Sequence, residues 1–261
     1  MDRALSFSAA PAGRHLPDFL GLGVQKGGTT TLHRLLADHP QVFLPEQKEV
    51  HYFSLHYAQG PAWYASHYGQ AAPGQRCGDI TPYYLFHPQA PGRIQALLPA
   101  ARLIVLLRDP VQRSLSQLFH SRRLGLEPLA PEAAIAAEPA RLLGAEAALA
   151  AAAGRHGSHQ EHSYVSRSRY ERQLPLWQAR FGPEQLLLLR SEDLFTDPAT
   201  VWERLQAFLG LTPLPLRGAL PWANAGEGEA AAVPEGLSQQ LRQQLEPTYR
   251  AMAVDYGMHW P

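Results

Sequence analysis

Continuous apolar runs, each followed by a polar turn and an amphipathic segment, are the first pattern along the chain. DFLGLGV at 18–24 and ARLIVLLRDP at 101–110 are apolar at most positions over the length of a strand. Strands of this kind are covered on both faces, as in a parallel sheet flanked by helices. The residues that follow, TTTLHRLLADHP at 29–40 and the segment after Pro110, have helical character, and Pro110 suits the first turn of a helix.

The remainder of the chain continues this alternation. We expect strands ending in turns at 75–84 and 184–194, short extended segments at 41–45 and 48–53, and helices at 62–68, 87–99, 169–182, 197–211 and 236–257. The alternation predicts an α/β fold, a three-layer sandwich with a mostly parallel central sheet. The length of 261 residues fits a single domain over 1–261, with an alanine-rich excursion of helices and loops at about 125–165.

Charge and cysteine content narrow the class of protein. The 23 basic and 23 acidic residues give a formal net charge of zero, which argues against a nucleic-acid or membrane-surface partner. The single cysteine, Cys77, excludes an internal disulfide and a four-cysteine zinc site and fits a reducing compartment. No segment has the length of a signal-peptide core or a membrane span, so we expect a cytoplasmic protein.

The turn between the first strand and the first helix has the composition of a phosphate-binding loop. In GVQKGGTTTLHRLL, glycines at 27 and 28 allow close approach to an anion, and Thr29, Thr30 and Thr31 add donors at a helix N-terminus. Lys26 precedes the glycines, whereas in a Walker A loop the lysine follows them. A P-loop kinase of small molecules is therefore disfavoured, although it stays open as an alternative.

Two segments together resemble sulfotransferases that use 3′-phosphoadenosine 5′-phosphosulfate (PAPS). Q-K-G-G-T-T-T-L resembles their 5′-phosphosulfate-binding loop, which implies that Lys26, Gly27, Gly28, Thr29, Thr30 and Thr31 hold the nucleotide. RDPVQRSLSQLFH resembles their 3′-phosphate-binding element, in which a serine follows an arginine by eight residues, here Arg108 and Ser116. A planar guanidinium at the end of a buried strand suits a phosphate. The resemblance also places Tyr170, at the start of a later helix, with the cofactor-binding residues.

A third segment resembles the carbohydrate sulfotransferases of this superfamily, including the heparan-sulfate type. KEVHYF at 48–53 matches their K-E-x-H-[FY]-F pattern, which implies that Glu49 is the general base for a sugar hydroxyl. His51 is the rival base. Lys26 is expected to stabilise charge on the departing phosphate and Lys48 to lie close to Glu49; these are the only two lysines in the chain.

The resemblance implies PAPS as sulfonyl donor, no metal, and a hydroxyl-bearing acceptor that is a carbohydrate or another small molecule. A binding module for PAPS or its product PAP without turnover is a further alternative. Some positions depart from the family pattern or have no assigned chemistry. Ile80 stands where a lysine is common, Ser168 replaces a usual glycine, Asp79 and the Glu192–Asp193 pair are expected to be structural, and Asn224 marks a loop near the 3′-phosphate.

Overall fold

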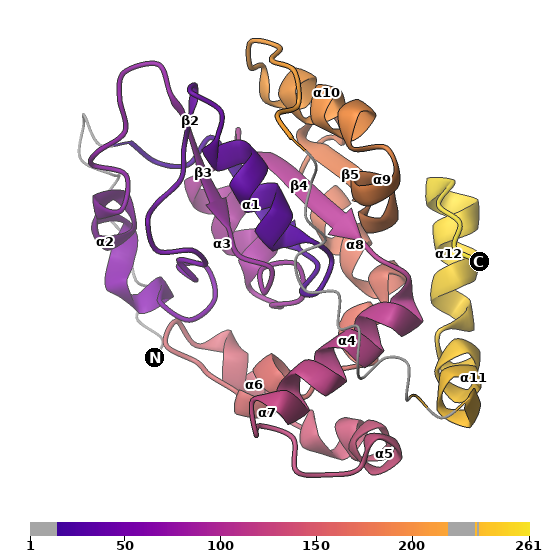
Figure 1. Ribbon diagram of the computed structural model, residues 1–261. Coiled ribbons are helices and arrows are strands. Elements are labelled where there is room, and N and C mark those ends of the chain that lie inside the picture. The colour runs from indigo at the N-terminus through magenta and orange to yellow at the C-terminus, as the bar shows by residue number, and fades with distance from the viewer. Residues whose placement is uncertain (1–14, 219–232, 234) are drawn as a thin grey trace.

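A five-stranded parallel sheet forms the centre of the computed structural model, which describes residues 15–218, 233 and 235–261 (Figure 1). The strands are β1 Phe19–Gly23, β2 Val42–Phe43, β3 Arg76–Ile80, β4 Arg102–Leu107 and β5 Leu186–Arg190. Their spatial order is β2-β3-β1-β4-β5, and every neighbouring pair is parallel. The two long apolar runs of the sequence are thus adjacent central strands.

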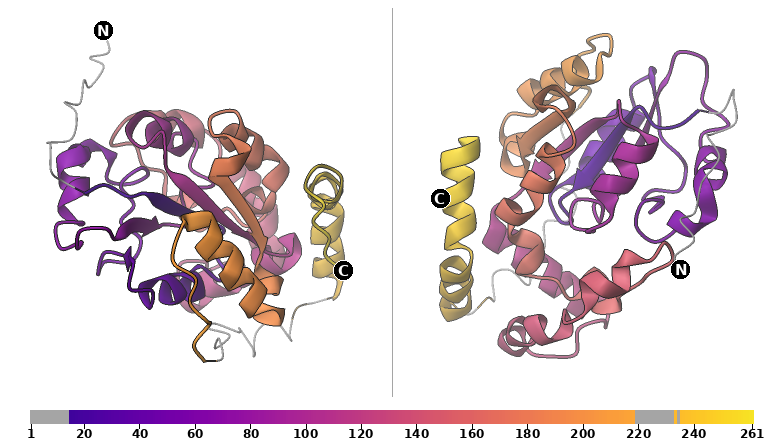
Figure 2. Two further views of the ribbon diagram at one scale, coloured as in Figure 1. Left: turned by 90° about the horizontal axis from the view of Figure 1, so that it is seen from above. Right: turned by 180° about the vertical axis from the view of Figure 1, so that it is seen from behind.

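Helices cover both faces of this sheet and make the predicted three-layer sandwich (Figure 2). One layer contains α1 Thr29–Ala37, α9 Ser191–Thr196 and α10 Pro198–Leu209; the other contains α3 Ala90–Leu97, α8 Tyr170–Gln178 and α12 Glu246–Tyr256. Neighbouring residues of β4 divide between the layers: Ile104 packs with Leu32 and Leu205 on one face, and Val105 packs with Ile94 on the other. This is why the strand is apolar at consecutive positions.

The alanine-rich excursion is helical and lies beyond the carboxyl end of the sheet (Figure 1). Its helices are α5 Pro131–Arg141, α6 Ala145–Ala150 and α7 Gly157–Glu161, preceded by α4 Pro110–Arg123. The remaining helices are α2 Gly60–Ser66, α11 Glu235–Gln244 and 3₁₀ turns at Tyr57–Gln59, Ser166–Ser168 and Pro183–Gln185. A third apolar cluster joins α4, α5 and α11 through Leu118, Ile135 and Leu241.

Three local predictions were wrong. The segment 48–53 is a loop and not extended, whereas the short extended segment expected at 41–45 is confirmed at Val42–Phe43. The turn expected after β5 is the short helix α9. The predicted final helix is two helices, because Leu245 leaves helical geometry just before Pro247 in the first turn of α12. In the part of the chain that the structure describes, no helix has the length and apolar character to cross a membrane.

Candidate active site

The glycine-rich loop joins the carboxyl end of β1 to the N-terminus of α1. A side chain at Gly27 would have its Cβ only 2.7 Å from the backbone oxygen of Leu106, so the loop packs too closely on β4 for any larger residue. Gly28 is the N-cap of α1 with φ 91°, a left-handed conformation that glycine adopts without strain. No side chain caps this helix. Its first N–H groups therefore remain available to an anion.

Lys26 lies at the centre of a positively charged group of side chains. Burial and the nearby charges of Arg123, Arg108 and Lys48 together lower the pKa of Lys26 to about 8, with burial as the largest cause. Cations held this close repel one another unless an anion lies between them. The charge distribution of the loop therefore fits a bound phosphate or sulfate group.

The second predicted anion-binding element begins where β4 ends. Asp109 caps α4 by accepting a hydrogen bond from the backbone N–H of Gln112 at 2.8 Å. Arg108 donates to the backbone oxygen of Lys26 at 3.0 Å, which joins this element to the glycine-rich loop. Tyr170 is fully buried and donates its hydroxyl hydrogen to the backbone oxygen of Arg108 at 2.8 Å. Tyr170 thus holds the backbone of Arg108 in place at the end of β4.

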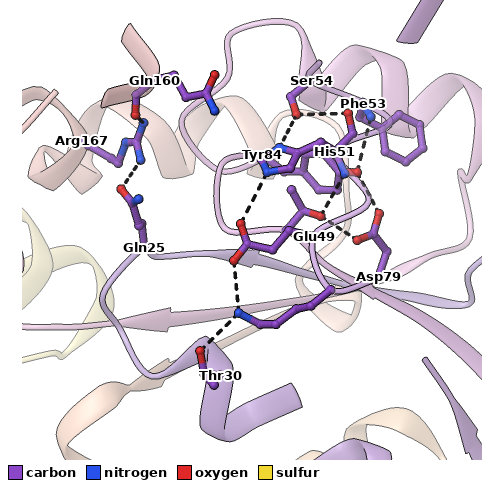
Figure 3. Close-up of polar contacts among 12 residues, drawn as sticks. Gln25, Thr30, Glu49, His51, Phe53, Ser54, Asp79, Tyr84, Gln160 and Arg167 are labelled. Carbon is purple, nitrogen blue, oxygen red and sulfur yellow. Dashed lines mark hydrogen bonds and ion pairs between the residues drawn. The ribbon is translucent and has the colours of Figure 1, made fainter. Parts of the chain in front are cut away.

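The loop at 48–51 brings a lysine, a carboxylate and an imidazole together (Figure 3). Lys48 Nζ lies 3.2 Å from Thr30 Oγ1 and 3.1 Å from Glu49 Oε1, so this loop is joined to the start of α1. His51 Nε2 lies 3.4 Å from Glu49 Oε2, and His51 Nδ1 lies 3.1 Å from Ser54 Oγ. The carboxylate of Glu49 is thereby held from both sides.

Three candidate catalytic residues of this region have an unusual backbone conformation. Among the described residues other than glycine, positive φ occurs at Lys26 (68°), Glu49 (64°) and His51 (56°). The left-handed conformation costs about 1–2 kcal/mol for a residue with a Cβ. Strained backbone of this kind gathers at functional sites, where surrounding contacts enforce it. Three candidate catalytic residues of the sequence thus share an unfavourable conformation, which supports a functional role for this region.

Opposing influences set the protonation of Glu49. Burial alone would raise the pKa of this carboxyl group, but the hydrogen bond with His51 and the charge of Lys48 outweigh burial and lower it below its usual value. Glu49 is consequently ionised at neutral pH and able to accept a proton. Glu49 lines the cleft described below, whereas His51 does not.

A buried hydroxyl network supports this loop from below. Asp79 accepts hydrogen bonds from Tyr64 at 2.9 Å, Tyr84 at 2.8 Å and Thr81 at 2.7 Å, and it is 1% exposed. Burial raises the pKa of Asp79, while these hydrogen bonds oppose the rise. Thr81 Oγ1 also accepts from the backbone N–H of His51 at 3.4 Å. Asp79 therefore has the structural role that was expected.

The glycine-rich loop, the end of β4 and the 48–49 turn line one cleft with a volume of about 210 Å³. Eight residues predicted from the sequence line it: Lys26, Gly28, Thr29, Thr30, Lys48, Glu49, Arg108 and Ser116. Four predicted residues do not: Gly27, Thr31, His51 and Tyr170. Thr31 is buried in the first turn of α1, and its hydroxyl has no hydrogen-bond partner within the described structure. Only the backbone N–H of Thr31, and not its hydroxyl, is available to bind an anion.

Five residues lining the cleft were not predicted: Gln25, Pro82, His120, Ser191 and Phe195. His120 could have been found from spacing, because it follows Ser116 by four positions and therefore lies on the same face of α4. Arg123 follows at the next turn, and its Nη2 lies 2.8 Å from His120 Nδ1. Phe195 has no such signal, because it reaches the cleft from α9, far along the chain.

The positions with no assigned chemistry have structural contacts. Ile80 is buried over Gly21 in the sheet core and does not line the cleft. Ser168 Oγ donates to the backbone oxygen of Pro110 at 2.9 Å and accepts from Arg113, which ties the 3₁₀ turn to α4. Asn224 lies outside the described residues.

The Glu192–Asp193 pair has separate partners. Glu192 accepts from the backbone N–H of Asp109 and from Trp260 Nε1, both at 2.9 Å. Asp193 Oδ1 lies 3.6 Å from Arg190 Nε and forms an ion pair with it. The helix that begins at Pro198, α10, is capped by Asp197, whose side chain accepts a hydrogen bond from the backbone N–H of Thr200.

Comparison with known proteins identifies the family. A model described as "Sulfotransferase domain" matches residues 16–217. The chain belongs to the sulfotransferase family. It is 33% identical over 210 residues to human heparan sulfate glucosamine 3-O-sulfotransferase 6, covering 79% of this chain and 56% of that protein. It is 44% identical over 109 residues to membrane-associated sulfotransferase kil1 of Dictyostelium discoideum, covering 41% of this chain and 23% of the relative. The chain thus spans about half or less of the length of these relatives.

Solved sulfotransferase structures share the fold. A sulfotransferase from Alicyclobacillus acidocaldarius superposes with a TM-score of 0.76 at 22% identity, covering 94% of this chain and 98% of that one. Mouse sulfotransferase SULT7A1, solved with PAP, superposes with a TM-score of 0.57 at 13% identity, covering 91% and 85%. The fold predicted from the sequence is confirmed.

Proposed function

We propose that this chain transfers the sulfonyl group of PAPS to a hydroxyl group by in-line displacement, with a carbohydrate as acceptor. One observation carries the proposal: two anion-binding elements, at the ends of adjacent strands β1 and β4, line the same cleft as Glu49. PAP carries a phosphate at each end of its ribose. We assign the two elements to those two phosphates, and we assign Glu49, which lines the same cleft, to the acceptor hydroxyl.

The charges of the cleft fit this nucleotide. Burial and the neighbouring charges, including that of Arg108, lower the pKa of Lys26, and burial lowers the pKa of Arg108. A bound anion would offset both effects. Lys26, Thr29 and Thr30 would hold the 5′ side, and Arg108 with Ser116 the 3′-phosphate. Arg108 also binds the backbone of Lys26, so the two elements have a fixed separation.

The residues of the cleft have distinct tasks in this reaction. PAPS supplies a sulfonyl group attached to a phosphate leaving group. Glu49 accepts the proton of the acceptor hydroxyl as that oxygen bonds to sulfur. The Lys26 ammonium stabilises the negative charge that develops on the phosphate oxygen as its bond to sulfur breaks. Lys48 keeps Glu49 ionised from one side and His51 holds it from the other, so the proton acceptor is in place before the substrate arrives.

Two observations support a carbohydrate as the acceptor. The K-E-x-H-[FY]-F pattern is present at 48–53, and a relative that shares 33% identity is named as acting on heparan sulfate glucosamine. The function is tested by incubating the protein with isotopically labelled PAPS and a panel of saccharides and small hydroxyl compounds, read by mass spectrometry. Labelled sulfate on a saccharide supports the proposal. Transfer only to non-carbohydrate hydroxyls would contradict the acceptor class, and no transfer with tight PAP binding would favour a binding module.

The kinase alternative has a separate test. The loop lacks the Walker A order of glycine, lysine and hydroxyl, so no lysine directly precedes the threonines that would bind magnesium. The same acceptor panel incubated with magnesium and ATP is expected to yield no phosphorylated product. Phosphorylated saccharide in that assay would contradict the proposed donor.

Replacing Arg108 is expected to remove the discrimination between PAP and AMP, which lacks the 3′-phosphate. Arg108→Met should raise the Kd for PAP by about 10- to 100-fold, the range for losing hydrogen bonds to a charged group, and leave the Kd for AMP nearly unchanged. Titration calorimetry with both nucleotides measures this. Arg102→Met is the control, because Arg102 begins the same strand at the opposite end. Equal weakening of PAP and AMP by Arg108→Met would contradict the assignment.

Binding of PAP is expected to depend on pH near 8. The pKa of Lys26 in the free protein is about 8, so Lys26 is charged below pH 8 and neutral above it. An anion bound against Lys26 favours the charged form, so binding at pH 8.5 should take up protons and affinity should fall as pH rises further. Calorimetry in two buffers of different ionisation enthalpy counts these protons. Undiminished proton uptake in Lys26→Met would show that another group is responsible.

A further inference from the structure

Arg167 is a buried cation without a carboxylate partner. It is 3% exposed, and within the described residues no acidic side chain forms an ion pair with it. Nη2 donates to the backbone oxygens of His159 at 3.1 Å and Gln160 at 2.7 Å, while Nε has no hydrogen-bond partner there. Burial lowers its pKa. An unpaired buried charge is expensive, so stability alone does not explain an arginine at this position.

The guanidinium plane is fixed from two directions. The rings of Tyr83 and Phe86 lie against it, with centroids 5.1 Å and 5.2 Å from Arg167 Cζ. The backbone oxygens from α7 hold one terminal nitrogen. The other terminal nitrogen, Nη1, is thereby directed at a single group, the side-chain oxygen of Gln25 (Figure 3).

Gln25 lines the cleft immediately before Lys26 in the glycine-rich loop. An amide group has an oxygen that accepts and a nitrogen that donates, and a guanidinium can only donate. Arg167 therefore permits one orientation of the Gln25 amide, with Oε1 toward Arg167. The Nε2 donors have no protein partner in the described structure and remain for a ligand in the cleft.

We propose that Arg167 is a positioning residue that orients the Gln25 amide so that its N–H₂ group donates to an oxygen of the sulfonyl group. The inference rests on the proposed function, because it assigns this contact to PAPS. The location favours the sulfonyl group over the phosphates: Gln25 lies between Lys26, assigned to the leaving oxygen, and Arg167, whose positive charge attracts a further anionic group. The effect of Arg167 on PAPS is exerted through Gln25.

The test compares the binding of PAPS and PAP without acceptor. Gln25→Leu removes the amide at similar size and is expected to raise the Kd for PAPS about 10-fold while leaving the Kd for PAP unchanged. Arg167→Met should have the same selective effect. The double variant should bind PAPS no more weakly than either single variant, because the two substitutions remove the same contact. Arg167→Lys, which keeps a donor, should recover part of the PAPS affinity.

A second pair of variants separates positioning from folding. Arg113 is also fully buried without an ion pair in the described residues, and it contacts Ser168 and Gln117 instead of Gln25. Arg113→Met is expected to lower Tm without changing the ratio of PAPS to PAP affinity. Gln25→Glu keeps an oxygen toward Arg167 but replaces the donor with an acceptor. It should lose PAPS selectivity even if Arg167→Met fails to fold.

The outcomes distinguish this inference from the proposed function. Equal changes in PAPS and PAP affinity, additive losses in the double variant, or normal PAPS selectivity in Gln25→Glu would each overturn the positioning role, even if the protein transfers sulfonyl groups. Selective loss of PAPS affinity in a protein without transfer activity would leave the positioning role in place and contradict the proposed function alone.

Discussion

Glu49→Gln is expected to lower the turnover number about 1000-fold, within the 10²- to 10⁴-fold range for loss of a general base. The amide is similar in size to the carboxylate but cannot take the proton of the acceptor hydroxyl. The Kd for PAP should change little, because the phosphates are assigned to Lys26, Arg108 and the start of α1. Initial rates with labelled PAPS and calorimetry with PAP measure the two quantities.

The neighbouring Glu46 provides a matched control. It is an exposed carboxylate three residues earlier in the same loop and does not line the cleft. Glu46→Gln should retain activity within about twofold, as expected of a surface position. A Glu49→Gln variant with near-normal turnover, or with loss of turnover only after His51→Ala, would transfer the role of base to His51.

Lys26→Met is expected to lower the turnover number by about 10²- to 10³-fold, comparable to the removal of one donor that stabilises transition-state charge. The reason is geometric as well as electrostatic. Lys26 adopts a left-handed backbone conformation between β1 and Gly27, and its carbonyl accepts from Arg108. Lys26 lines the cleft together with Thr29 and Thr30 at the start of α1, where the leaving phosphate is expected. Steady-state kinetics with saturating PAPS isolates this effect from binding.

Two further variants test why Lys26→Met lowers the turnover number. Lys26→Arg retains the charge but substitutes a planar fork for a compact ammonium, so it should recover only part of the rate. Lys48→Met leaves Lys26 in place and should cost less, because Lys48 acts on Glu49 and Thr30. If Lys26→Met weakened PAPS binding and left the saturated rate intact, Lys26 would be a binding residue only.

The sequence was sufficient for the architecture where short-range rules apply. Apolar runs at consecutive positions gave β1 and β4, and glycines after the first run gave the anion-binding loop. The eight-residue interval from Arg108 to Ser116 placed both on the cleft, because Pro110 starts a helix whose periodicity turns Ser116 back toward the strand end. These relations span few residues, so local preferences decide them.

The loop at 48–53 shows why other parts could not be predicted. The segment was expected to be extended, yet its apolar residues are buried without strand pairing. Tyr52 stacks on Tyr64 with ring centroids 4.4 Å apart, and the left-handed turns at Glu49 and His51 allow this. The contact between Gln25 and Arg167 spans 142 residues, so no local pattern indicates it. Tertiary packing determines both features.

A crystal structure of the protein with PAP would show directly whether the cleft binds this nucleotide. We predict one nucleotide spanning the cleft, with its 5′-phosphate against Lys26 and the N–H groups of Thr29 and Thr30, and its 3′-phosphate against Arg108 and Ser116. The carboxylate of Glu49 should lie beside the open end of the 5′-phosphate. A nucleotide bound away from the two strand ends, or with its 3′-phosphate in the glycine-rich loop, would rule out the proposed assignment of the two phosphates.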